Sequence, residues 1–513
     1  SMNQNGLRDQ AMQAIATTKW MPDWGQKRIE NMVSGRPDWC ISRQRTWGVP
    51  IPLFVHQQSG ELHPDSQTLI EKVALAVEQQ GIDAWFDMDA SDLIGADAEN
   101  YFKVTDTLDV WFDSGVSHAC VLTRRDDLQR PADLYLEGSD QHRGWFQSSL
   151  LTSVATTGKA PYKAVLTHGF TVDAEGKKMS KSKGNTVSPQ KVVNNLGADI
   201  IRLWVAATDY SAEMTVSDEI LKRTADSYRR IRNTARYLLS NLNDFDPASN
   251  LVATEKLLPL DRWVLDRAYH LQLEILAAYE SYQFHLIYQK VHNFCANELG
   301  SAYLDITKDR QYTMPADSLG RRSSQTAMYH ILEALSRWIA PVLSFTADEL
   351  WEFIPGQRNA SVLLNDWYQS LEPLSQDSAL SVADWQKLFS VREAVSKELE
   401  NKRNQGEVKG GLTADVNLYA EDKLLEVLNK VGDELKFVLI TSSAKRFAMT
   451  DKPGTAINTS LTGLAIDIQA SENTRCERCW HQTDDVGSHA NHPELCGRCF
   501  ENVDGDGETR RFA

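Results

Sequence analysis

The chain lacks the long apolar stretches that membrane proteins carry. Among its 513 residues there is no run of eighteen apolar residues and no apolar core of a signal peptide, so we expect no membrane-spanning segment. Cysteine is also scarce, with seven residues, and four of these fall in two CxxC pairs near the C-terminus. This usage indicates a protein of the reducing cytoplasm, with a metal site rather than a disulfide framework.

Two common nucleotide-binding signatures are missing as well. Neither GxGxxG nor GxxxxGK[ST] occurs, so dinucleotide oxidoreductases and P-loop enzymes lose their main support. The net charge of -16, taken alone, argues against a nucleic-acid partner. It does not exclude one, because binding to RNA depends on local basic surfaces and not on the sum. The length and the 42% hydrophobic content predict two to four globular domains.

A lysine-rich loop is the most distinctive segment. Four lysines fall within the seven residues from Lys177 to Lys183, flanked by Gly176 and Gly184 and without apolar periodicity. Lysine ammonium groups on such a loop can neutralise charge that develops on a phosphate. A solvated basic patch or a nuclear-localisation-like run is the alternative. The order of residues favours the first reading, because it spells the KMSKS signature of class I aminoacyl-tRNA synthetases: Lys178, Met179, Ser180, Lys181 and Ser182.

Two predicted strands end in polar residues upstream of this loop. The first runs from Asp133 into Glu137-Gly138, and a helix is expected to start at Ser139 or Asp140. That helix would turn Trp145, Phe146, Leu150 and Leu151 toward a sheet. The second strand, residues 163–170, ends at His168-Gly169 on the same sheet edge, where open α/β sheets bind ligands. Plain turn chemistry and a packed histidine are the alternatives.

Helices dominate the rest of the chain. Pro189 begins one helix and residues 199–207 form another, which completes one half of a doubly wound sheet. Residues 221–242 form a long helix with an apolar stripe and five cations, which face either solvent or phosphates: Lys222, Arg223, Arg229, Arg230 and Arg236.

A helical bundle follows to residue 353, with breaks expected at Gly300, Pro315 and Pro341. Three of its aromatics either stack bases or pack: Tyr282, Tyr288 and Trp338. Residues 381–404 form another helix, and residues 406–470 a small α+β unit with strands at 414–419 and 437–440.

The C-terminal region carries two CxxC knuckles separated by 16 residues. This spacing fits a closed zinc site with four thiolate ligands, Cys476, Cys479, Cys496 and Cys499. Two redox pairs are the alternative. His481, His489 and His492 lie between the knuckles, but four cysteines make them unnecessary as ligands. Arginines and aromatics around the knuckles suggest contact with RNA: Arg475, Arg478, Arg498, Arg510, Arg511, Trp480 and Phe500.

Taken together, these segments resemble one protein family. Residues 38–52 and 109–115, like the KMSKS loop, resemble isoleucyl-, valyl- and leucyl-tRNA synthetases, and the whole chain resembles the C-terminal part of bacterial isoleucyl-tRNA synthetases. The zinc module favours the isoleucyl branch. In this setting Cys40 is expected to be a small buried residue, and residues 57–100 an insertion without an assigned role.

The resemblance implies an α/β plus all-α fold in four parts. Residues 1–215 would be the second half of a Rossmann-like catalytic domain with the KMSKS loop, and residues 216–400 an α-helical anticodon-binding domain. Residues 401–470 would be a small α+β junction unit, and residues 471–513 the four-cysteine zinc module.

The resemblance also implies ligands and roles. The aminoacyl adenylate would be bound by Glu137, Gly138, Asp140, Gln141 and Trp145. ATP, with Mg²⁺, would lie near His168 and Gly169 and the loop residues Met179, Ser180, Lys181 and Ser182, and Lys178 and Lys181 would stabilise the transition state. The tRNA(Ile) would contact Arg229, Arg236, Arg478 and Trp480, and one structural Zn²⁺ would be held by the four cysteines.

One departure from the family qualifies this expectation. The second ATP-binding signature, HIGH, is absent: none of the twelve histidines lies in an HxGH-like sequence. We therefore expect the half-domain with HIGH and the editing domain to be missing, and this chain, a cytoplasmic monomer, to bind tRNA(Ile) without catalysing the reaction with isoleucine and ATP. The alternatives are a non-catalytic tRNA-binding accessory protein with a degenerate synthetase fold, or a fragment of a valyl- or leucyl-type enzyme.

Overall fold

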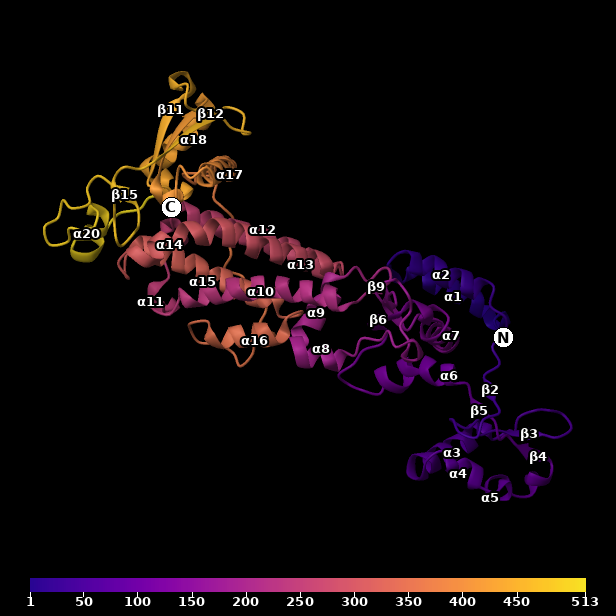
Figure 1. Cartoon of the computed structure of the whole chain (residues 1–513). Coiled ribbons are helices and arrows are strands. Elements are labelled where there is room, and N and C mark those ends of the chain that lie inside the picture. The colour runs from indigo at the N-terminus through magenta and orange to yellow at the C-terminus, as the bar shows by residue number, and fades with distance from the viewer. The chain divides into compact units, whose positions relative to one another are not determined.

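The computed structural model describes all residues from 1 to 513 and divides the chain into two compact units (Figure 1). The first unit contains residues 1–186 and 210–215. The second contains residues 187–209 and 216–513. None of the helices combines the length and the hydropathy that crossing a bilayer requires.

A parallel three-stranded sheet organises the first unit. Its order is β1 (Lys19–Met21), β7 (Tyr162–His168) and β6 (Ala132–Gly138). The helices α1 (Leu7–Thr17), α2 (Trp24–Ser34) and α7 (Trp145–Thr157) share one apolar core with the sheet, in which Phe146, Leu150 and Val165 are fully buried. The structure confirms the predicted strands and their parallel arrangement. It adds the short strand β1, which has only three residues and therefore no readable periodicity.

The helix after β6 begins later than predicted. A 3₁₀ turn occupies Ser139–His142, and α7 starts only at Trp145. The side chain of Gln141 accepts a hydrogen bond from the backbone N–H of Trp145 at 2.9 Å. The prediction that Ser139 or Asp140 caps the helix was wrong, because the cap comes from a side chain in the preceding turn.

The remainder of the first unit is built mostly from short elements. They are β2 (Ser42–Arg43), β3 (Phe54–His56), α3 (Ser66–Gln80), α4 (Asp83–Asp87), α5 (Ala90–Ile94), β4 (Tyr101–Lys103), β5 (Thr107–Leu108), α6 (Val110–Gly115), β8 (Thr171–Val172) and β9 (Met214–Thr215). The segment from β3 to β4 has a small core of its own around Trp85, so the unassigned insertion is a folded subdomain. Cys40 is exposed, not buried as predicted, because it lies in the irregular stretch before β2.

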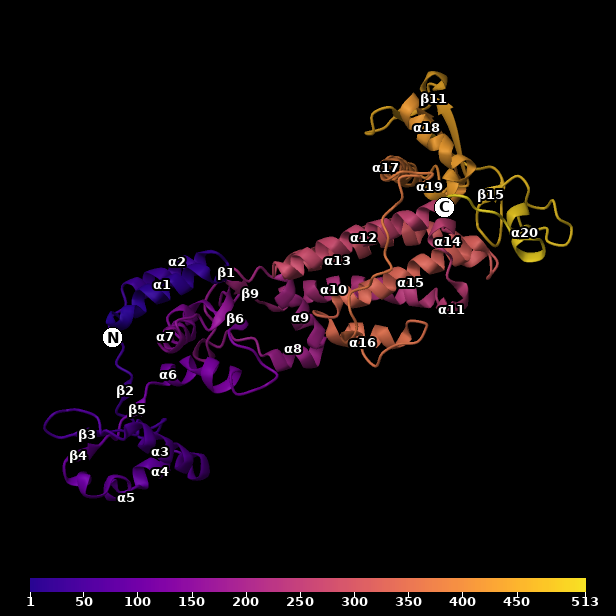
Figure 2. The ribbon, with the colours of Figure 1, turned by 180° about the vertical axis from the view of Figure 1, so that it is seen from behind.

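Helices of a bundle make up most of the second unit. They are α8 (Pro189–Leu196), α9 (Ala198–Ala207), α10 (Asp218–Ser240), α11 (Pro247–Asn250), α12 (Pro259–Glu280), α13 (Phe284–Asn293), α14 (Leu304–Thr313), α15 (Leu319–Ile339) and α16 (Ser344–Phe353). Figure 2 shows α10, α12 and α15 running alongside one another. Their common core includes Ile231, Ala235 and Leu238 of α10, which confirms the predicted apolar stripe.

Two details of the bundle differ from the prediction. No break occurs at Gly300, because α13 continues through a π-helical segment, Phe294–Tyr303, into α14. Glycine weakens a helix, but packing on neighbouring helices overrides that cost of about 1 kcal/mol. Trp338, considered as a stacking platform, is fully buried, and its ring nitrogen donates to Gln272. It is a core residue.

The C-terminal part follows a long helix, α17 (Val382–Asn404), which agrees with the helix predicted over residues 381–404 and which Ser381 caps. A four-stranded sheet of order β11-β10-β13-β12 comes next. Its elements, with the flanking helices and the zinc module, are β10 (Ala414–Ala420), α18 (Asp422–Val431), α19 (Leu435–Leu439), β11 (Ser443–Ala448), β12 (Ile457–Asn458), β13 (Leu464–Ala470), β14 (Thr474–Arg475), β15 (Gln482–Thr483) and α20 (Gly497–Asp504). The predicted strand at Phe437–Ile440 is wrong: that segment belongs to α19, with Ile440 at its left-handed C-terminus.

Candidate functional site

Polar groups meet at the carboxyl ends of β6 and β7, as predicted. Gly138 and His168 are direct partners across the two parallel strands, and His168 Nε2 lies 3.9 Å from Glu137 Oε1. His168 Nδ1 is 2.8 Å from the carbonyl oxygen of Gly169, so this nitrogen carries the proton and donates. Half of the Glu137 side chain is exposed, so the carboxylate is open to a cationic ligand.

Two glycines bring backbone close to this edge. A Cβ at Gly138 would lie 2.9 Å from Oδ1 of Asp140, and a Cβ at Gly169 would lie only 2.0 Å from the carbonyl oxygen of Ala212. The amide of Gly169 donates to Tyr210, which holds this crossing together. Gly169 therefore needs glycine, because its close contacts are with backbone, whereas the contact at Gly138 is with the carboxylate of a side chain that can move.

The residues after β6 form a fixed wall. Trp145 stacks on Tyr135 with ring centroids 4.0 Å apart and an interplanar angle of 8°. Its ring nitrogen donates to the carbonyl oxygen of Ser114 at 3.0 Å. Asp140 and Gln141 occupy the 3₁₀ turn between the strand end and this ring pair. The structure thus brings the five predicted adenylate-binding residues together on one strand–turn–helix segment, while their roles stay a prediction.

Hydrogen bonds of two residues that the sequence patterns did not predict, Asp173 and Asn185, hold the two ends of the lysine loop together. The side chain of Asn185 donates to Asp173 at 2.7 Å and accepts from the backbone N–H of Ser180 at 3.0 Å. The other oxygen of Asp173 accepts from the amide of Lys177 at 2.8 Å, and these hydrogen bonds, that of Asn185 first, lower the pKa of the Asp173 carboxyl. The available signal was the Asp-x-x-Gly turn from Asp173 to Gly176.

Within the loop the lysines stay available. The four lysines are exposed, and none forms an ion pair with a carboxylate: Lys177, Lys178, Lys181 and Lys183. Lys178 Nζ lies 4.8 Å from the ring centre of Phe170, two residues beyond His168. Ser180 and Ser182 face each other, with Oγ atoms 3.2 Å apart. The loop is therefore anchored beside the strand end that carries His168, and its charges are free to bind an anion such as a phosphate.

The four C-terminal cysteines form the second predicted site. Their Sγ atoms all lie within 4.8 Å of one another, and those of Cys479 and Cys496 are 3.7 Å apart. Ligands about 2.3 Å from a zinc ion at the corners of a tetrahedron are separated by about 3.8 Å. The donors are all thiols and all buried, so the cluster fits a structural Zn²⁺. No histidine belongs to it.

Ion pairs connect the zinc module to the bundle, and they change the interpretation of its arginines. Arg498 contacts Asp309 of α14 at 2.7 Å, and also Glu508 at 3.0 Å. Arg510 pairs with the same two carboxylates. Arg498 and Arg510 are therefore structural residues and not a free RNA-binding surface, although the sequence suggested contact with RNA for both.

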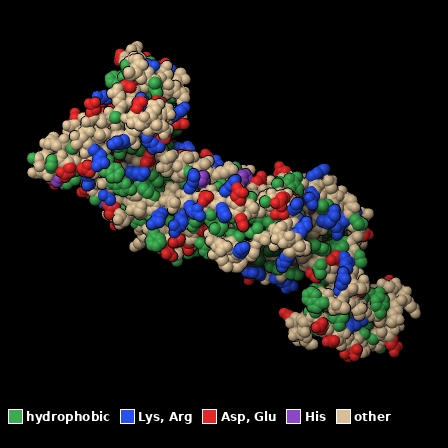
Figure 3. All heavy atoms as spheres, in the orientation of Figure 1, with side chains coloured by type: hydrophobic (Ala, Val, Ile, Leu, Met, Phe, Trp, Pro, Cys, Tyr) green, Lys and Arg blue, Asp and Glu red, His purple; other side chains and the backbone are tan.

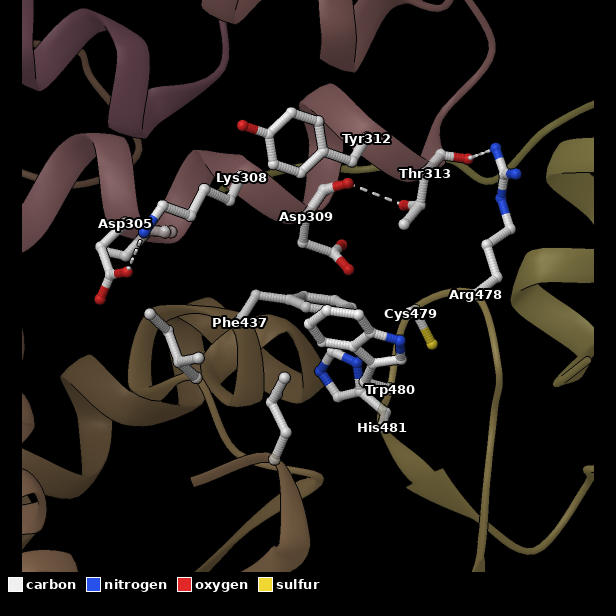
Figure 4. Close-up of a pocket in the computed structure, with 13 residues that line it drawn as sticks. Asp305, Lys308, Asp309, Tyr312, Thr313, Phe437, Arg478, Cys479, Trp480 and His481 are labelled. Atoms are coloured by element: carbon white, nitrogen blue, oxygen red, sulfur yellow. Dashed lines mark hydrogen bonds and ion pairs between the residues drawn. The ribbon is translucent and has the colours of Figure 1, made fainter. Parts of the chain in front are cut away.

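A pocket of about 390 Å³ lies where the zinc module, α14 and α19 meet (Figure 4). Trp480 follows the ligand Cys479 in a left-handed conformation, with φ of 65°, and its ring is 60% exposed. Tyr312, equally exposed, and Lys308 line the facing helix. Arg478 reaches back to the carbonyl oxygen of Thr313 at 3.2 Å. Exposed rings and cations around one pocket suit an unstacked nucleotide base.

The basic stripe of α10 is less uniform than predicted. All five cations are exposed, but Arg223 pairs with Glu219 and Arg229 pairs with Asp226 on the same helix. Arg236, in contrast, forms no ion pair. Figure 3 shows basic side chains interspersed with acidic ones over the visible face of the molecule, in keeping with the net negative charge.

Comparisons with known proteins give consistent matches. Residues 1–217 match the family model for class I tRNA synthetases (I, L, M and V), residues 261–418 the anticodon-binding domain of tRNA ligase, and residues 475–502 the zinc finger found in FPG and IleRS. The isoleucine--tRNA ligase of Thioalkalivibrio sulfidiphilus is 63% identical over the whole chain, and those of Hahella chejuensis and Methylococcus capsulatus are each 61% identical. The chain spans about half the length of these relatives, 55%, 55% and 54% respectively.

Proposed function

Because the chain belongs to the class I aminoacyl-tRNA synthetases, in the branch of the isoleucine--tRNA ligases, we propose that it is part of an enzyme that joins isoleucine to tRNA(Ile). The reaction activates isoleucine with ATP to form isoleucyl adenylate and then transfers the isoleucyl group to the tRNA. The observation that carries the proposal is the free lysine loop anchored beside the ends of β6 and β7, where Glu137 and His168 meet.

In this proposal the strand ends hold the adenylate. The exposed carboxylate of Glu137 binds the ammonium group of isoleucine, and Trp145, fixed against Tyr135, lines the pocket for its side chain. Gly138, Asp140 and Gln141 hold the adenylate. His168 and Gly169 lie near the adenosine, where the crossing beside Ala212 leaves no room for a side chain.

The loop supplies charge. Lys178 and Lys181 stabilise negative charge as the carboxylate of isoleucine attacks the α-phosphate of ATP and pyrophosphate leaves. Met179, Ser180 and Ser182 form the rest of the ATP-binding loop. This chemistry needs positioned charge more than covalent participation, and Mg²⁺ neutralises the phosphates further when it is bound.

The second unit binds tRNA(Ile) in this proposal. Trp480, with Arg478, presents an exposed ring at the pocket beside α14, and the four cysteines, with one Zn²⁺, hold that ring in place. Arg229 and Arg236 contribute charge on α10, although the partner Asp226 weakens the contribution of Arg229.

The isolated chain should bind tRNA(Ile) without forming isoleucyl adenylate, because no HxGH-like sequence is present to complete the ATP site. A pyrophosphate-exchange assay with isoleucine and ATP, run beside a tRNA-binding titration, tests both halves of this statement. Exchange by the isolated chain would mean that it contains a complete active site. Affinity for tRNA that does not fall with salt would contradict the proposed phosphate contacts.

A further inference from the structure

A groove between α10 and α16 combines features that neither helix shows alone. It has a volume of about 190 Å³. Its lining residues come from the two helices: Arg232, Arg236, Leu239, Thr346, Glu349, Leu350 and Phe353. Among them only Arg236 is predicted from the sequence to contact RNA, because the periodicity of α10 does not reveal which helix packs beside it.

The two arginines of the groove differ from their neighbours on the same helix. Arg232 and Arg236 form no ion pair and no side-chain hydrogen bond, whereas Arg223 and Arg229 are paired with carboxylates of α10. One carboxylate, that of Glu349, lines the groove. The groove therefore keeps an excess of one positive charge, within a chain of net charge -16.

An exposed aromatic ring borders these charges. Phe353, the last residue of α16, is 66% exposed although it lies beside the buried Leu350. An exposed phenylalanine ring is a stacking surface for an unstacked base, and a guanidinium beside it can bind the phosphate of the same nucleotide. Glu349 can accept from an amino group on the edge of such a base.

The floor of the groove is rigid. Asp199 of α9, itself buried, accepts from the backbone N–H of Thr346 at 2.8 Å and from its hydroxyl at 2.6 Å. The hydroxyl of Tyr228 on α10 is 2.9 Å from the same Thr346 oxygen. These contacts fix α16 against α10, so the arginines and the ring are held in place before a ligand arrives.

We infer that this groove binds a single unstacked nucleotide of an RNA, with its base on Phe353 and its phosphate on Arg232 and Arg236. The inference rests on the proposed function, in which the RNA is tRNA(Ile). It adds a second RNA contact, separate from the pocket at Trp480. It also assigns a recognition role to α16, which the sequence predicted only as part of a helical bundle.

The test compares matched pairs of variants of the full chain. Phe353→Ala should weaken the binding of tRNA(Ile) about tenfold, since stacking of one base contributes about 5- to 150-fold in affinity. Phe345→Ala removes a ring from the same helix that is also 66% exposed but does not line the groove, and it should leave affinity unchanged. Phe353→Tyr should retain binding.

The charges are tested through salt dependence. Arg236→Ala should reduce the slope of log affinity against log salt concentration by about 1, as the loss of one phosphate contact does. Arg229→Ala, on the same helix but paired with Asp226, should change the slope less. Equal effects of Phe345→Ala and Phe353→Ala, or of the two arginine variants, would overturn the inference. They would show that the RNA is attracted by the overall positive potential of this surface and not bound in the groove.

Failure of the inference and failure of the proposed function give different results. If the groove variants bind tRNA(Ile) like the unaltered chain while Trp480→Ala weakens binding, the groove is not a contact and the function stands. If the unaltered chain does not bind tRNA(Ile), a single-stranded RNA oligonucleotide is titrated instead. Binding of the oligonucleotide that depends on Phe353 would support the groove as a nucleotide site and contradict tRNA(Ile) as its ligand. No binding would contradict both the groove site and the proposed function.

Discussion

At the scale of single residues, the lysine loop offers its own control. In an enzyme of full length that carries this sequence, Lys181→Ala should lower the rate of adenylate formation by about 10²–10³, the usual loss for one positioned charge-stabilising donor. The affinity for isoleucine should change little. Pyrophosphate exchange measures both parameters.

Lys183→Ala is the matched variant, because Lys183 is an exposed lysine of the same short turn that has no assigned role. It should reduce the rate far less than Lys181→Ala. Equal reductions would show that the loop acts only through its total charge.

His118 gives a prediction on pH. Its ring is 1% exposed and hydrogen-bonded to Thr152 at 3.1 Å, and burial, with Arg130 nearby, lowers the pKa of His118 to about 4. The unfolded chain binds a proton at an ordinary pKa of about 6.5, so the unfolded state gains protons first as the pH falls. The free energy of unfolding of the first unit should therefore decrease from about pH 6.5 to pH 4, by at most a few kcal/mol from this residue.

His118→Gln keeps a donor for Thr152 and removes the titration. Chemical denaturation at pH 7 and pH 4.5 should show a smaller difference for the variant than for the unaltered chain. The same difference in both would mean that His118 titrates normally in the folded state.

At the scale of elements, strongly periodic segments were predictable and short apolar ones were not. The strands β6 and β7 and the helices α8, α10 and α17 were expected close to their observed positions, because period and caps agree over many residues. Phe437 to Ile440 carries no such signal, since four apolar residues suit a buried helix as well as a strand. The preceding Gly432–Glu434 turn and burial against α14 settle it as helix α19.

The tie at the base of the lysine loop is a property of that element and can be removed alone. Asn185→Ala loses the hydrogen bonds to Asp173 and to the amide of Ser180. With about 1 kcal/mol for each bond, the loss is about 2 kcal/mol, so local opening of the loop should become roughly thirtyfold more frequent. Limited tryptic digestion cuts after the exposed lysines, and the rate of cleavage in the loop should increase by the same factor as the opening.

Asn194→Ala serves as the control, because Asn194 makes a similar side-chain contact, with Gln190, on α8, the next helix along the sequence. Its digestion rate should equal that of the unaltered chain. An unchanged rate for Asn185→Ala would show that the loop is held by other contacts.

At the scale of the whole molecule, the folding of the C-terminal module should depend more on its zinc site than on any other single feature. One zinc per chain is expected in metal analysis, and Cys499→Ser should lose it. Apparent zinc-binding energies of about 10–16 kcal/mol exceed what so small a module gains from its own core. Loss of the metal should unfold residues 471–513, and faster hydrogen exchange of the backbone amides in this segment measures that unfolding.

The bundle should survive that loss. Its core contains no zinc ligand, and a fully buried pair, Arg310 with Asp261 at 2.8 Å, lies inside it. The far-ultraviolet circular dichroism of the metal-free chain should therefore retain most of its helical signal. Collapse of that signal, or full activity in tRNA binding without zinc, would contradict the proposed arrangement.

The proposed RNA-binding surfaces were the least predictable feature at this scale. The motif residues Glu137, His168 and the KMSKS loop could be placed because their order in the chain is informative. Which arginines are free could not be read in this way, since the partners Asp226, Asp309 and Glu508 are set by helix geometry and by contacts far apart in the sequence. Arg498 and Arg510 were misjudged for that reason, and Arg232 was overlooked.

The crossing at Gly169 has a consequence for the evolution of the chain. Even a methyl group at position 169 would lie 2.0 Å from the backbone carbonyl oxygen of Ala212, so no substitution of Gly169 is neutral. Because the clash is with backbone, a change of the side chain at position 212 cannot relieve it. Gly184, at the end of the lysine loop, has open space around it and a φ of 68°, which asparagine tolerates. A saturation library scored for folding should find position 169 closed to all nineteen alternatives, while position 184 admits a few. Position 184, at the end of the lysine loop, can therefore vary within a small set of residues, whereas position 169, which precedes the loop, stays fixed as glycine.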